Sequence, residues 1–198
     1  IQDGNRRYAQ KQGVDTSIGH RMGADTTERV LDWAQELGVQ QITLYAFSTE
    51  NFRRDESELE ALFTLFKEKF RAILDDERVK KKRIRVRMIG DRSLLPADLL
   101  EAIDAAEEAT RQYSNYFINV AIAYGGRNEI VHAARSILEK VRQGAIDPDS
   151  IDPAAVERHL NRGALIPPVD LIIRTGNDYR TSNFLPWLAN GHESAVYF

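Results

Sequence analysis

The chain has 198 residues, a length typical of one domain. Hydrophobic residues make up 42% and charged residues 29%, so the chain can bury a core, and no stretch reaches the about 18 uninterrupted apolar residues of a membrane-spanning helix. The 27 Lys and Arg against 30 Asp and Glu give a net charge of -3, which argues against a dedicated nucleic-acid-binding protein. The absence of cysteine excludes disulfides, thiolate zinc sites and cysteine nucleophiles, and the four isolated histidines argue against a histidine metal site.

Strand-like and helical patterns alternate along the chain. The strand-like runs are 41–47, 84–89, 117–124, 169–174 and 195–198, several of them apolar on both faces, as in strands covered by helices from both sides. Apolar residues at helical spacing lie between them, at 30–37, 59–74, 99–106 and 130–141. Gly38 is a C-cap signal for the first of these helices, and Pro96 opens the third. The alternation predicts an α/β fold, a single domain with a central, mostly parallel sheet flanked by helices.

The ends and two polar segments complete the organisation. Residues 1–2 resemble the end of an apolar run and 196–198 stop within a strand-like run, so we expect one domain over 1–198 with both termini truncated. The segment 143–153 is predicted to be a loop, with a short helix beginning near its end. Residues 78–87 hold seven basic residues in ten, which indicates either a solvated helix end followed by a strand with outward arginines or, less favoured, a patch for anionic lipid headgroups.

Four polar loops follow apolar strand-like runs. They are 3–7 (DGNRR), 48–54 (STENFRR), 125–129 (GGRNE) and 174–183 (RTGNDYRTSN). In parallel sheets ligands bind where strands end and helices begin, so these loops are the candidate site. Glycine lets backbone N–H groups approach an anion, the helix dipole favours negative charge, and arginine grips oxygens bidentately. The composition therefore indicates phosphate binding.

Asp3 is the one carboxylate of the first loop, beside Gly4 and two arginines. Magnesium prefers one or two carboxylates together with phosphate oxygens, so Asp3 is placed to carry Mg²⁺ to a diphosphate. The alternative is an Asp-Gly turn residue that accepts only local hydrogen bonds. The chain has no GxxxxGK[ST] and no GxGxxG pattern, so common nucleotide sites are not indicated.

Taken together, the motifs resemble those of the cis-prenyltransferase family, which includes undecaprenyl and dehydrodolichyl diphosphate synthases. The similar segments occur in the family's order and spacing over nearly the whole chain: 1–9 (IQDGNRRYA), 19–24 (GHRMGA), 43–54 (TLYAFSTENFRR), 89–91 (IGD), 119–130 (NVAIAYGGRNEI) and 170–187 (DLIIRTGNDYRTSNFLPW). The resemblance implies the family's fold with a hydrophobic tunnel. It also implies a Mg²⁺-dependent enzyme that condenses isopentenyl diphosphate head-to-tail onto an allylic diphosphate starter, farnesyl or geranylgeranyl diphosphate, to give a long-chain Z-polyprenyl diphosphate.

The resemblance also implies roles for individual residues. Asp3 matches the magnesium-binding catalytic aspartate, and Asn51 lines the reacting centre with Ser48. The expected substrate-binding residues are Gly4, Asn5, Arg6, Arg7, His20, Ser48, Arg54, Arg174, Arg180 and Ser182, of which Arg174, Arg180 and Ser182 would hold the diphosphate of isopentenyl diphosphate. Glu193 is the candidate for a second acidic metal ligand. His20 is alternatively a packing residue at a helix start, and Arg127 orders its loop or a dimer contact instead of touching substrate.

Several positions depart from the bacterial pattern of this family. Arg6 stands where many bacterial members have glycine, Phe52 replaces a common tryptophan, and Asn177 and Asp178 replace the usual glycine and glutamate. The segment 14–18 lacks an arginine that bacterial members use at the starter diphosphate, and 188–198 appears longer. These features are similar to those of archaeal members, in which the starter is often geranylgeranyl diphosphate.

Two other hypotheses remain beside this one. The chain could use an unusual isoprenoid acceptor, which the altered 177–178 and 188–198 segments leave open, or it could be a non-catalytic partner subunit. The second is disfavoured because Asp3, Arg174 and Arg180 are all present. We expect a homodimer, no nucleic-acid partner, and a cytoplasmic protein with peripheral membrane contact for product release.

One apolar stripe has two interpretations. Leu59, Leu62, Phe63, Phe66 and Phe70 share one face at helical spacing. The pattern alone favours an ordinary core, whereas the resemblance favours the wall of the hydrocarbon tunnel.

Overall fold

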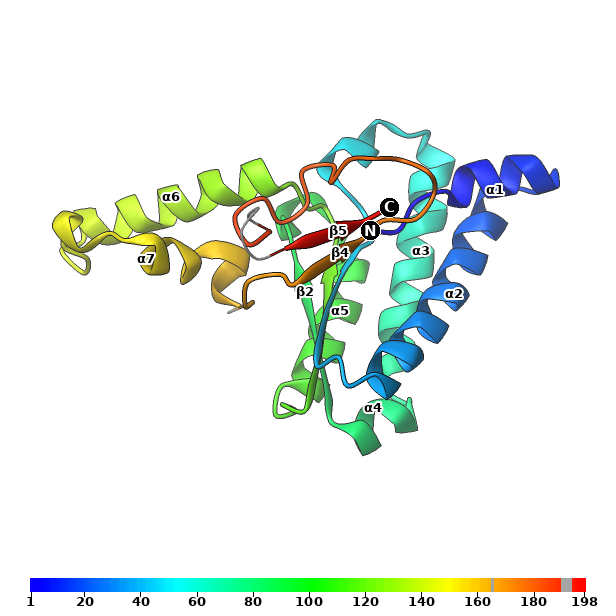
Figure 1. The fold of residues 1–198 in the computed structure, drawn as a ribbon, viewed down its shortest axis with the longest axis horizontal. Coiled ribbons are helices and arrows are strands. Elements are labelled where there is room, and N and C mark those ends of the chain that lie inside the picture. Colours follow the sequence, from blue (N-terminus) through cyan, green and yellow to red (C-terminus); the bar gives the residue numbers. More distant parts are fainter. Residues whose placement is uncertain (165, 190–193) are drawn as a thin grey trace.

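The computed structural model describes residues 1–164, 166–189 and 194–198. Figure 1 shows a body of sheets and helices from which α6 (Gly126–Arg142) and α7 (Pro153–Glu157) project as an arm, while both chain ends lie in the body. Among these residues no helix is long and apolar enough to cross a bilayer.

The central sheet has three parallel strands, β1 (Gln41–Tyr45), β2 (Ile84–Ile89) and β3 (Tyr116–Ala121), in the order β1-β3-β2. Tyr45 and Ile89 both pair with Ala121, so the three strands end at one level. The predicted α/β architecture with a parallel sheet is therefore confirmed, and the loops that follow β1 and β3 begin side by side.

The remaining two strands form a separate sheet, which differs from the single sheet that we expected. Within the described ranges, β4 (Leu171–Ile173) and β5 (Ala195–Tyr197) pair only with each other, in parallel. Side-chain packing connects the chain that follows β4 to the central sheet, because Phe184, Leu185 and Leu188 share a buried cluster with Tyr45, Ile89, Ala121 and Tyr124. The amino group of Ile1 donates to the carbonyl of Ile173 at 2.6 Å, which holds the first residues against β4.

The helices flanking the sheet follow the predicted apolar periodicity. They are α2 (Thr16–Glu36), α3 (Glu56–Ile73) and α5 (Ala97–Thr110). The carboxylate of Asp15 accepts from the backbone N–H of Ser17 at 2.8 Å and begins α2, and Gly38 follows its end with φ +78°. α5 packs on β2 and on α3, and α3 in turn contacts α2. The core between α3, α5 and the sheet contains Phe47, Leu62, Phe70, Val86, Met88, Leu99 and Ile103.

One helix has no predicted counterpart. α1 (Asn5–Gln12) lies where the sequence indicates only a polar loop, and it packs against α2. It begins after Gly4, at φ +95°, and ends at Gly13, at φ +66°, conformations that glycine adopts without steric cost. Its single buried residue is Ala9, so it carries too few apolar positions to show a helical stripe.

The basic run begins in a short helix, α4 (Glu77–Lys82), and continues into β2. Arg78 forms ion pairs with Asp76 at 2.8 Å and Asp32 at 3.4 Å. The guanidinium of Arg87 lies 4.9 Å from the ring centroid of Phe117. These contacts favour the structural interpretation for Arg78 and Arg87, whose charges are engaged within the protein.

The connections are short helical turns. η1 (Thr49–Arg53) follows β1, η2 (Arg92–Leu94) follows β2, and η3 (Pro148–Ser150) and η4 (Leu160–Gly163) lie in the arm. Asp152 accepts from the backbone N–H of Ala155 at 2.7 Å and begins α7, as the sequence predicts.

Candidate active site

A cavity of about 720 Å³ lies between α2, α3 and the central sheet, within the size range of small-molecule sites. One of its ends is polar and is formed by the loops after Ile1, after β1 and after β4. All of the predicted catalytic and substrate-binding residues line the cavity: Asp3, Gly4, Asn5, Arg6, Arg7, His20, Ser48, Asn51, Arg54, Arg174, Arg180 and Ser182. Glu193 lies outside the described residues.

Arg174 is the central cation of the polar end. It follows β4 directly and is 5% exposed. Its Nη2 donates to Asp3 Oδ2 at 2.7 Å and its Nη1 to Ser182 Oγ at 2.6 Å. Its Nε is buried without a hydrogen-bond partner among the described atoms. A buried guanidinium with an open donor is suited to an anion with several oxygens, such as a diphosphate.

Asp178 joins the arginines of the site, and sequence reasoning noted it only as a departure from the family pattern. Its Oδ2 lies 3.2 Å from Arg174, 3.2 Å from Arg180 and 3.6 Å from Arg7. Arg7 also donates to the carbonyl of Gly176 at 2.6 Å. The carboxylate of Asp178 therefore holds three arginines close together. In the sequence, the indication of this role is that Asp178 stands between Arg174 and Arg180 in one loop.

The carboxylate of Asp3 is held ionised. Burial raises its pKa, but hydrogen bonds from Arg174 and from the backbone N–H of Gly4 outweigh the burial, so the pKa lies below its usual value. Gly4 donates to Asp3 Oδ1 at 2.6 Å, and Arg7 lies 3.3 Å from the same oxygen. An ionised carboxylate beside arginines is suited to bind a divalent cation together with phosphate oxygens.

Ser48 and Asn51 are positioned by a reciprocal cap at the start of η1. The backbone N–H of Ser48 donates to Asn51 Oδ1 at 2.9 Å, and the Ser48 side chain accepts from the backbone of Asn51. Tyr45 Oη donates to the carbonyl of Ser182 at 3.2 Å, which links the loop after β1 to the loop after β4. Burial raises the pKa of Tyr45 to about 12, so it acts as a neutral donor.

Glu58, which the sequence analysis did not select, organises the other side of the polar end. Its carboxylate lies 3.0 Å from His20 Nε2, 2.9 Å from Arg54 and 3.6 Å from Arg6. The spacing of Arg54 and Glu58, four residues apart at the start of α3, is the available signal. Burial lowers the pKa of His20 in spite of the neighbouring Glu58, so the ring is neutral at pH 7 and donates to the carboxylate.

The predicted loop 125–129 does not join the other three. Residues Gly125, Asn128 and Glu129 line a second cavity of about 410 Å³ between α6, η4 and the strand ends. Glu129 accepts from Tyr124 Oη and from the backbone N–H of Asn161, and the backbone N–H of Arg127 donates to Asn183. Arg127 is absent from the lining of the main cavity, so this loop braces the arm against the body.

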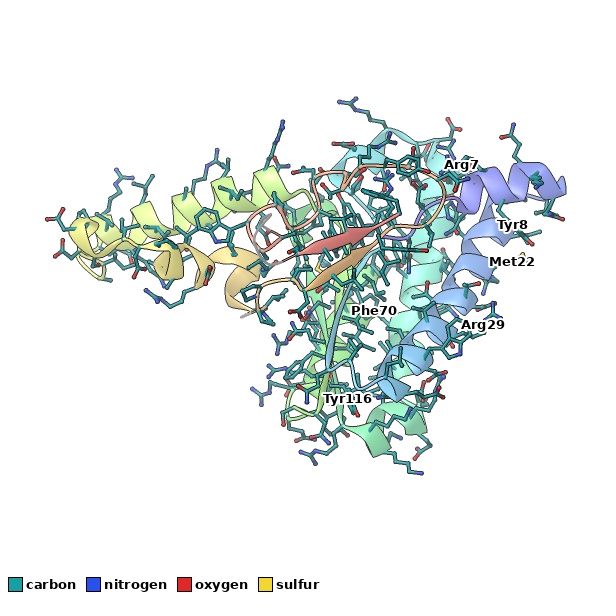
Figure 2. The ribbon with its side chains drawn as sticks, in the orientation of Figure 1. Arg7, Tyr8, Met22, Arg29, Phe70 and Tyr116 are labelled. Atoms are coloured by element: carbon teal, nitrogen blue, oxygen red, sulfur yellow. The ribbon has the colours of Figure 1, made fainter. Side chains whose placement is uncertain are left out.

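The other end of the main cavity is apolar. Only part of the apolar stripe on α3 lines it. Leu62, Phe66 and Phe70 line the cavity, with Ile118 and Val120 of β3 opposite. Figure 2 shows Phe70 on the side of α3 that faces the sheet. Leu59 and Phe63 belong instead to the surrounding core. One helix thus contributes to both the cavity wall and the core.

The described residues contain no cluster of three or more His, Cys, Asp or Glu side chains that could hold a metal ion by itself. Asp3 and Asp178 both contact Arg174 and lie at the polar end of the cavity. Such a site can hold Mg²⁺ only together with oxygens of a bound phosphate group, a donor set that Mg²⁺ accepts.

Comparison with known proteins agrees with this geometry. A family model described as "Putative undecaprenyl diphosphate synthase" matches residues 1–198. Two archaeal relatives, from Halobacterium salinarum and Methanosarcina mazei, are 52% and 51% identical over 100% of this chain. Both are named tritrans,polycis-undecaprenyl-diphosphate synthase (geranylgeranyl-diphosphate specific), and the chain spans 65% and 67% of their lengths.

A solved structure also matches. Lavandulyl diphosphate synthase from Lavandula x intermedia, in complex with dimethylallyl diphosphate, is 35% identical with a TM-score of 0.90, over 98% of this chain and 83% of that chain. The family model, the archaeal relatives and this structure agree with the resemblance that the motifs indicate. The chain therefore belongs to the cis-prenyltransferase family of undecaprenyl diphosphate synthases.

Proposed function

We propose that the chain condenses isopentenyl diphosphate head-to-tail onto geranylgeranyl diphosphate and repeats the step to build a long Z-polyprenyl diphosphate. The observation that carries the proposal is the continuity of the cavity, with an arginine-rich end followed by an apolar end in one space. A prenyl diphosphate has the same two halves, an anionic head and a hydrocarbon tail. The names of the archaeal relatives favour geranylgeranyl diphosphate as the starter.

The residues at the polar end would divide the work between two diphosphates. Gly4, Asn5 and Arg7, at the start of α1, would bind the diphosphate of the allylic starter, where the helix N-terminus adds favourable dipoles. Arg174, Arg180 and Ser182 would bind isopentenyl diphosphate, with Arg174 already fixed by its hydrogen bond to Ser182. Ser48 and Asn51 would lie at the reacting carbons.

Charge stabilisation and positioning suffice for this reaction. The allylic C–O bond breaks as the diphosphate leaves, the double bond of isopentenyl diphosphate forms the new C–C bond, and a proton departs to give the Z double bond. Asp3, with Asp178 nearby, would hold Mg²⁺ together with diphosphate oxygens, and bound Mg²⁺ would neutralise the leaving group. Arg7 and Arg174 would supply further positive charge where the leaving group develops its negative charge.

The test is incorporation of labelled isopentenyl diphosphate with farnesyl or geranylgeranyl diphosphate, with and without Mg²⁺. We expect Mg²⁺-dependent polyprenyl product, faster with geranylgeranyl diphosphate, and a loss of at least about 10²–10³-fold in Asp3→Ala. Asp147→Ala, an exposed carboxylate of the arm, is the matched control and should retain activity. Failure to incorporate with either starter would overturn the proposal.

A second candidate function has one observation in its favour. The lavandulyl diphosphate synthase that this fold matches is in complex with dimethylallyl diphosphate. The chain would then join two short allylic diphosphates. Competition between dimethylallyl diphosphate and isopentenyl diphosphate as acceptor separates the two functions, and product from dimethylallyl diphosphate alone would favour the second.

We also propose that residues 1–198 are one catalytic domain that acts as a homodimer through its arm. On α6, Val131 and Leu138 are 48% and 60% exposed. The elements against which α6 packs most extensively are η4 and α7, which both belong to the arm. A Leu138→Glu variant should lower the molar mass in light scattering to that of a monomer. A monomeric unsubstituted protein would contradict this assembly.

A further inference from the structure

The outer side of α1 and α2 exposes several large apolar side chains to solvent. Tyr8, Ile18, Met22, Val30, Trp33 and Leu37 are between 42% and 83% exposed. On α2 the exposed positions recur at helical spacing, so they share one face, and Figure 2 shows Tyr8 and Met22 along the outer edge of the two helices. We call these six residues the outer face.

The opposite side of the same helix already has a function in the cavity. Ala24, Thr27 and Leu31 of α2 line the main cavity. α2 therefore has an apolar face outward and a mixed face toward the cavity, where Glu28 and Asp32 also lie. The cavity is separated from the outer face by the thickness of a single helix. Exposed apolar patches of this kind mark sites of protein or membrane interaction.

Most charges around the outer face are paired within the protein. Asp25 and Glu28 pair with Lys69, and Asp32 pairs with Arg78, so these carboxylates of α2 are neutralised by neighbouring helices. Arg29 is exposed and donates to the hydroxyl of Thr26, at 3.3 Å. In the described part of the chain, Glu36 is the one carboxylate of α2 without an ion pair.

α1 contributes one further cation. Of the three basic residues in its sequence, NRRYAQKQ, Arg6 and Arg7 form ion pairs at the cavity, and Lys11 remains for the outer face. Lys11 is exposed and stands one turn beyond Tyr8. Lysine, arginine, tryptophan, tyrosine and methionine around an apolar strip are the composition of helices that lie in the interface of a membrane, with anionic lipids attracting the cations.

We propose that the outer face docks on the surface of a lipid bilayer that contains anionic headgroups, with α2 lying in the plane of the interface. The docking would place the cavity one helix away from the membrane. The purpose of this docking rests on the proposed function, because a long polyprenyl product must pass from the cavity to a bilayer. The test of the docking is independent of that function, since vesicle binding requires neither substrate nor turnover.

The chain supplies its own reporter. It has two tryptophans, Trp33 on the outer face and Trp187 near the second sheet. In a Trp187→Phe variant the emission comes from Trp33 alone. We expect a blue shift and co-sedimentation with phosphatidylcholine vesicles that contain phosphatidylglycerol, and a weaker response with phosphatidylcholine alone.

Substitutions at exposed positions locate the contact without threatening the fold. In the reporter variant, Leu37→Gln should weaken vesicle binding about tenfold, since it removes one apolar anchor, and Arg29→Gln about fivefold, since each cation near an anionic surface contributes about 1 kcal/mol. The controls are Leu94→Gln, an apolar side chain 46% exposed on η2, and Arg111→Gln at the end of α5. Neither should change binding.

Two results would overturn the proposal. One is a Trp33 emission that does not shift with either kind of vesicle, or a loss of vesicle binding in the control variants as large as that in Leu37→Gln and Arg29→Gln. The other is a lipid-independent shift that grows with protein concentration together with a doubled mass, which would mean that a second copy covers the outer face. Inactivity of the enzyme with normal vesicle binding would reject the proposed function and leave the docking surface standing.

Discussion

The two ends of the main cavity are stabilised by opposite kinds of interaction. At the polar end, charged atoms from distant parts of the chain are bonded directly, as in the 2.7 Å contact of Arg174 with Asp3, 171 residues away. At the apolar end, Leu62, Phe66 and Phe70 pack without directional bonds. A polar contact depends on the position of each atom, whereas an apolar wall depends on shape and volume. We therefore expect changes at the polar end to alter chemistry and changes at the apolar end to alter product length.

The largest effect is expected for Arg174. Arg174→Gln should lower activity about 10²–10³-fold, because it removes charge stabilisation at the diphosphate. It should also lower the free energy of unfolding by about 3–5 kcal/mol, because Asp3 and Asp178 lose their buried partner. Labelled isopentenyl diphosphate incorporation and urea unfolding measure the two effects.

Arg180→Gln is the matched control for that experiment. The Arg180 side chain is 67% exposed and shares Asp178 with Arg174. It should lose activity while the free energy of unfolding changes by less than about 0.5 kcal/mol. If both substitutions lower the free energy of unfolding equally, the burial of Arg174 does not add to its contribution to stability.

A matched pair of phenylalanines tests the apolar end. Phe66 and Phe63 both pack against Phe47, with ring centroids 6.3 Å and 5.5 Å away, but only Phe66 lines the cavity. Each alanine variant should lose about 2–4 kcal/mol of stability. Phe66→Ala should also lengthen the products resolved by chromatography, and Phe63→Ala should not. Unchanged product chain lengths in Phe66→Ala would show that the stripe on α3 serves only as hydrophobic core.

Gly176 tests the geometry of the polar end with a smaller expected effect. It has φ +91°, and a Cβ there would lie 2.9 Å from Arg7 Nη2 and 3.1 Å from the backbone carbon of Asp3. Gly176→Ala should reduce activity about tenfold by displacing these groups, beyond a backbone strain of about 1 kcal/mol. Gly144→Ala, at φ +71° with nothing within 4 Å, should show the strain alone. Equal activity of the two variants would contradict the prediction.

The smallest effect concerns pH. Because burial lowers the pKa of folded His20, the unfolded chain binds the proton more readily between that pKa and the unfolded value near 6.5. Stability should therefore be complete above about pH 6.5 and fall as the pH drops toward the folded pKa. His20→Gln should flatten this part of a melting-temperature profile, while His132→Gln, on the exposed face of α6, should leave the slope unchanged. A slope that persists in His20→Gln would assign it to another group.

Most elements of the fold could be predicted because their signal is local. Apolar residues repeat at the period of a strand in 84–89 and of a helix in 59–74, and both segments fold accordingly. α1 could not be predicted, since a helix with one buried residue has no stripe and depends on packing against α2. The separation of β4 and β5 from the central sheet could not be predicted either, because strand pairing is a choice among distant partners.

The candidate site was predictable in kind. The loops after parallel strands meet at the same edge of a sheet, so their arginines, glycines and Asp3 could be grouped from the sequence alone. The loop 125–129 has a similar composition, yet Gly125 and Glu129 line the second cavity. Composition indicates what a loop can bind, and only the packing of α6 decides what it faces.

The sequence by itself determined the family, the order of strands and helices, and the residue types that gather around one cavity. The tertiary structure decided the connections between them: Asp178 among three arginines, Glu58 between His20 and Arg54, and the outer face left uncovered on α2. The reason is physical. Periodicity and motif spacing act over a few residues, whereas an ion pair or an exposed face depends on how elements far apart in the chain pack against one another.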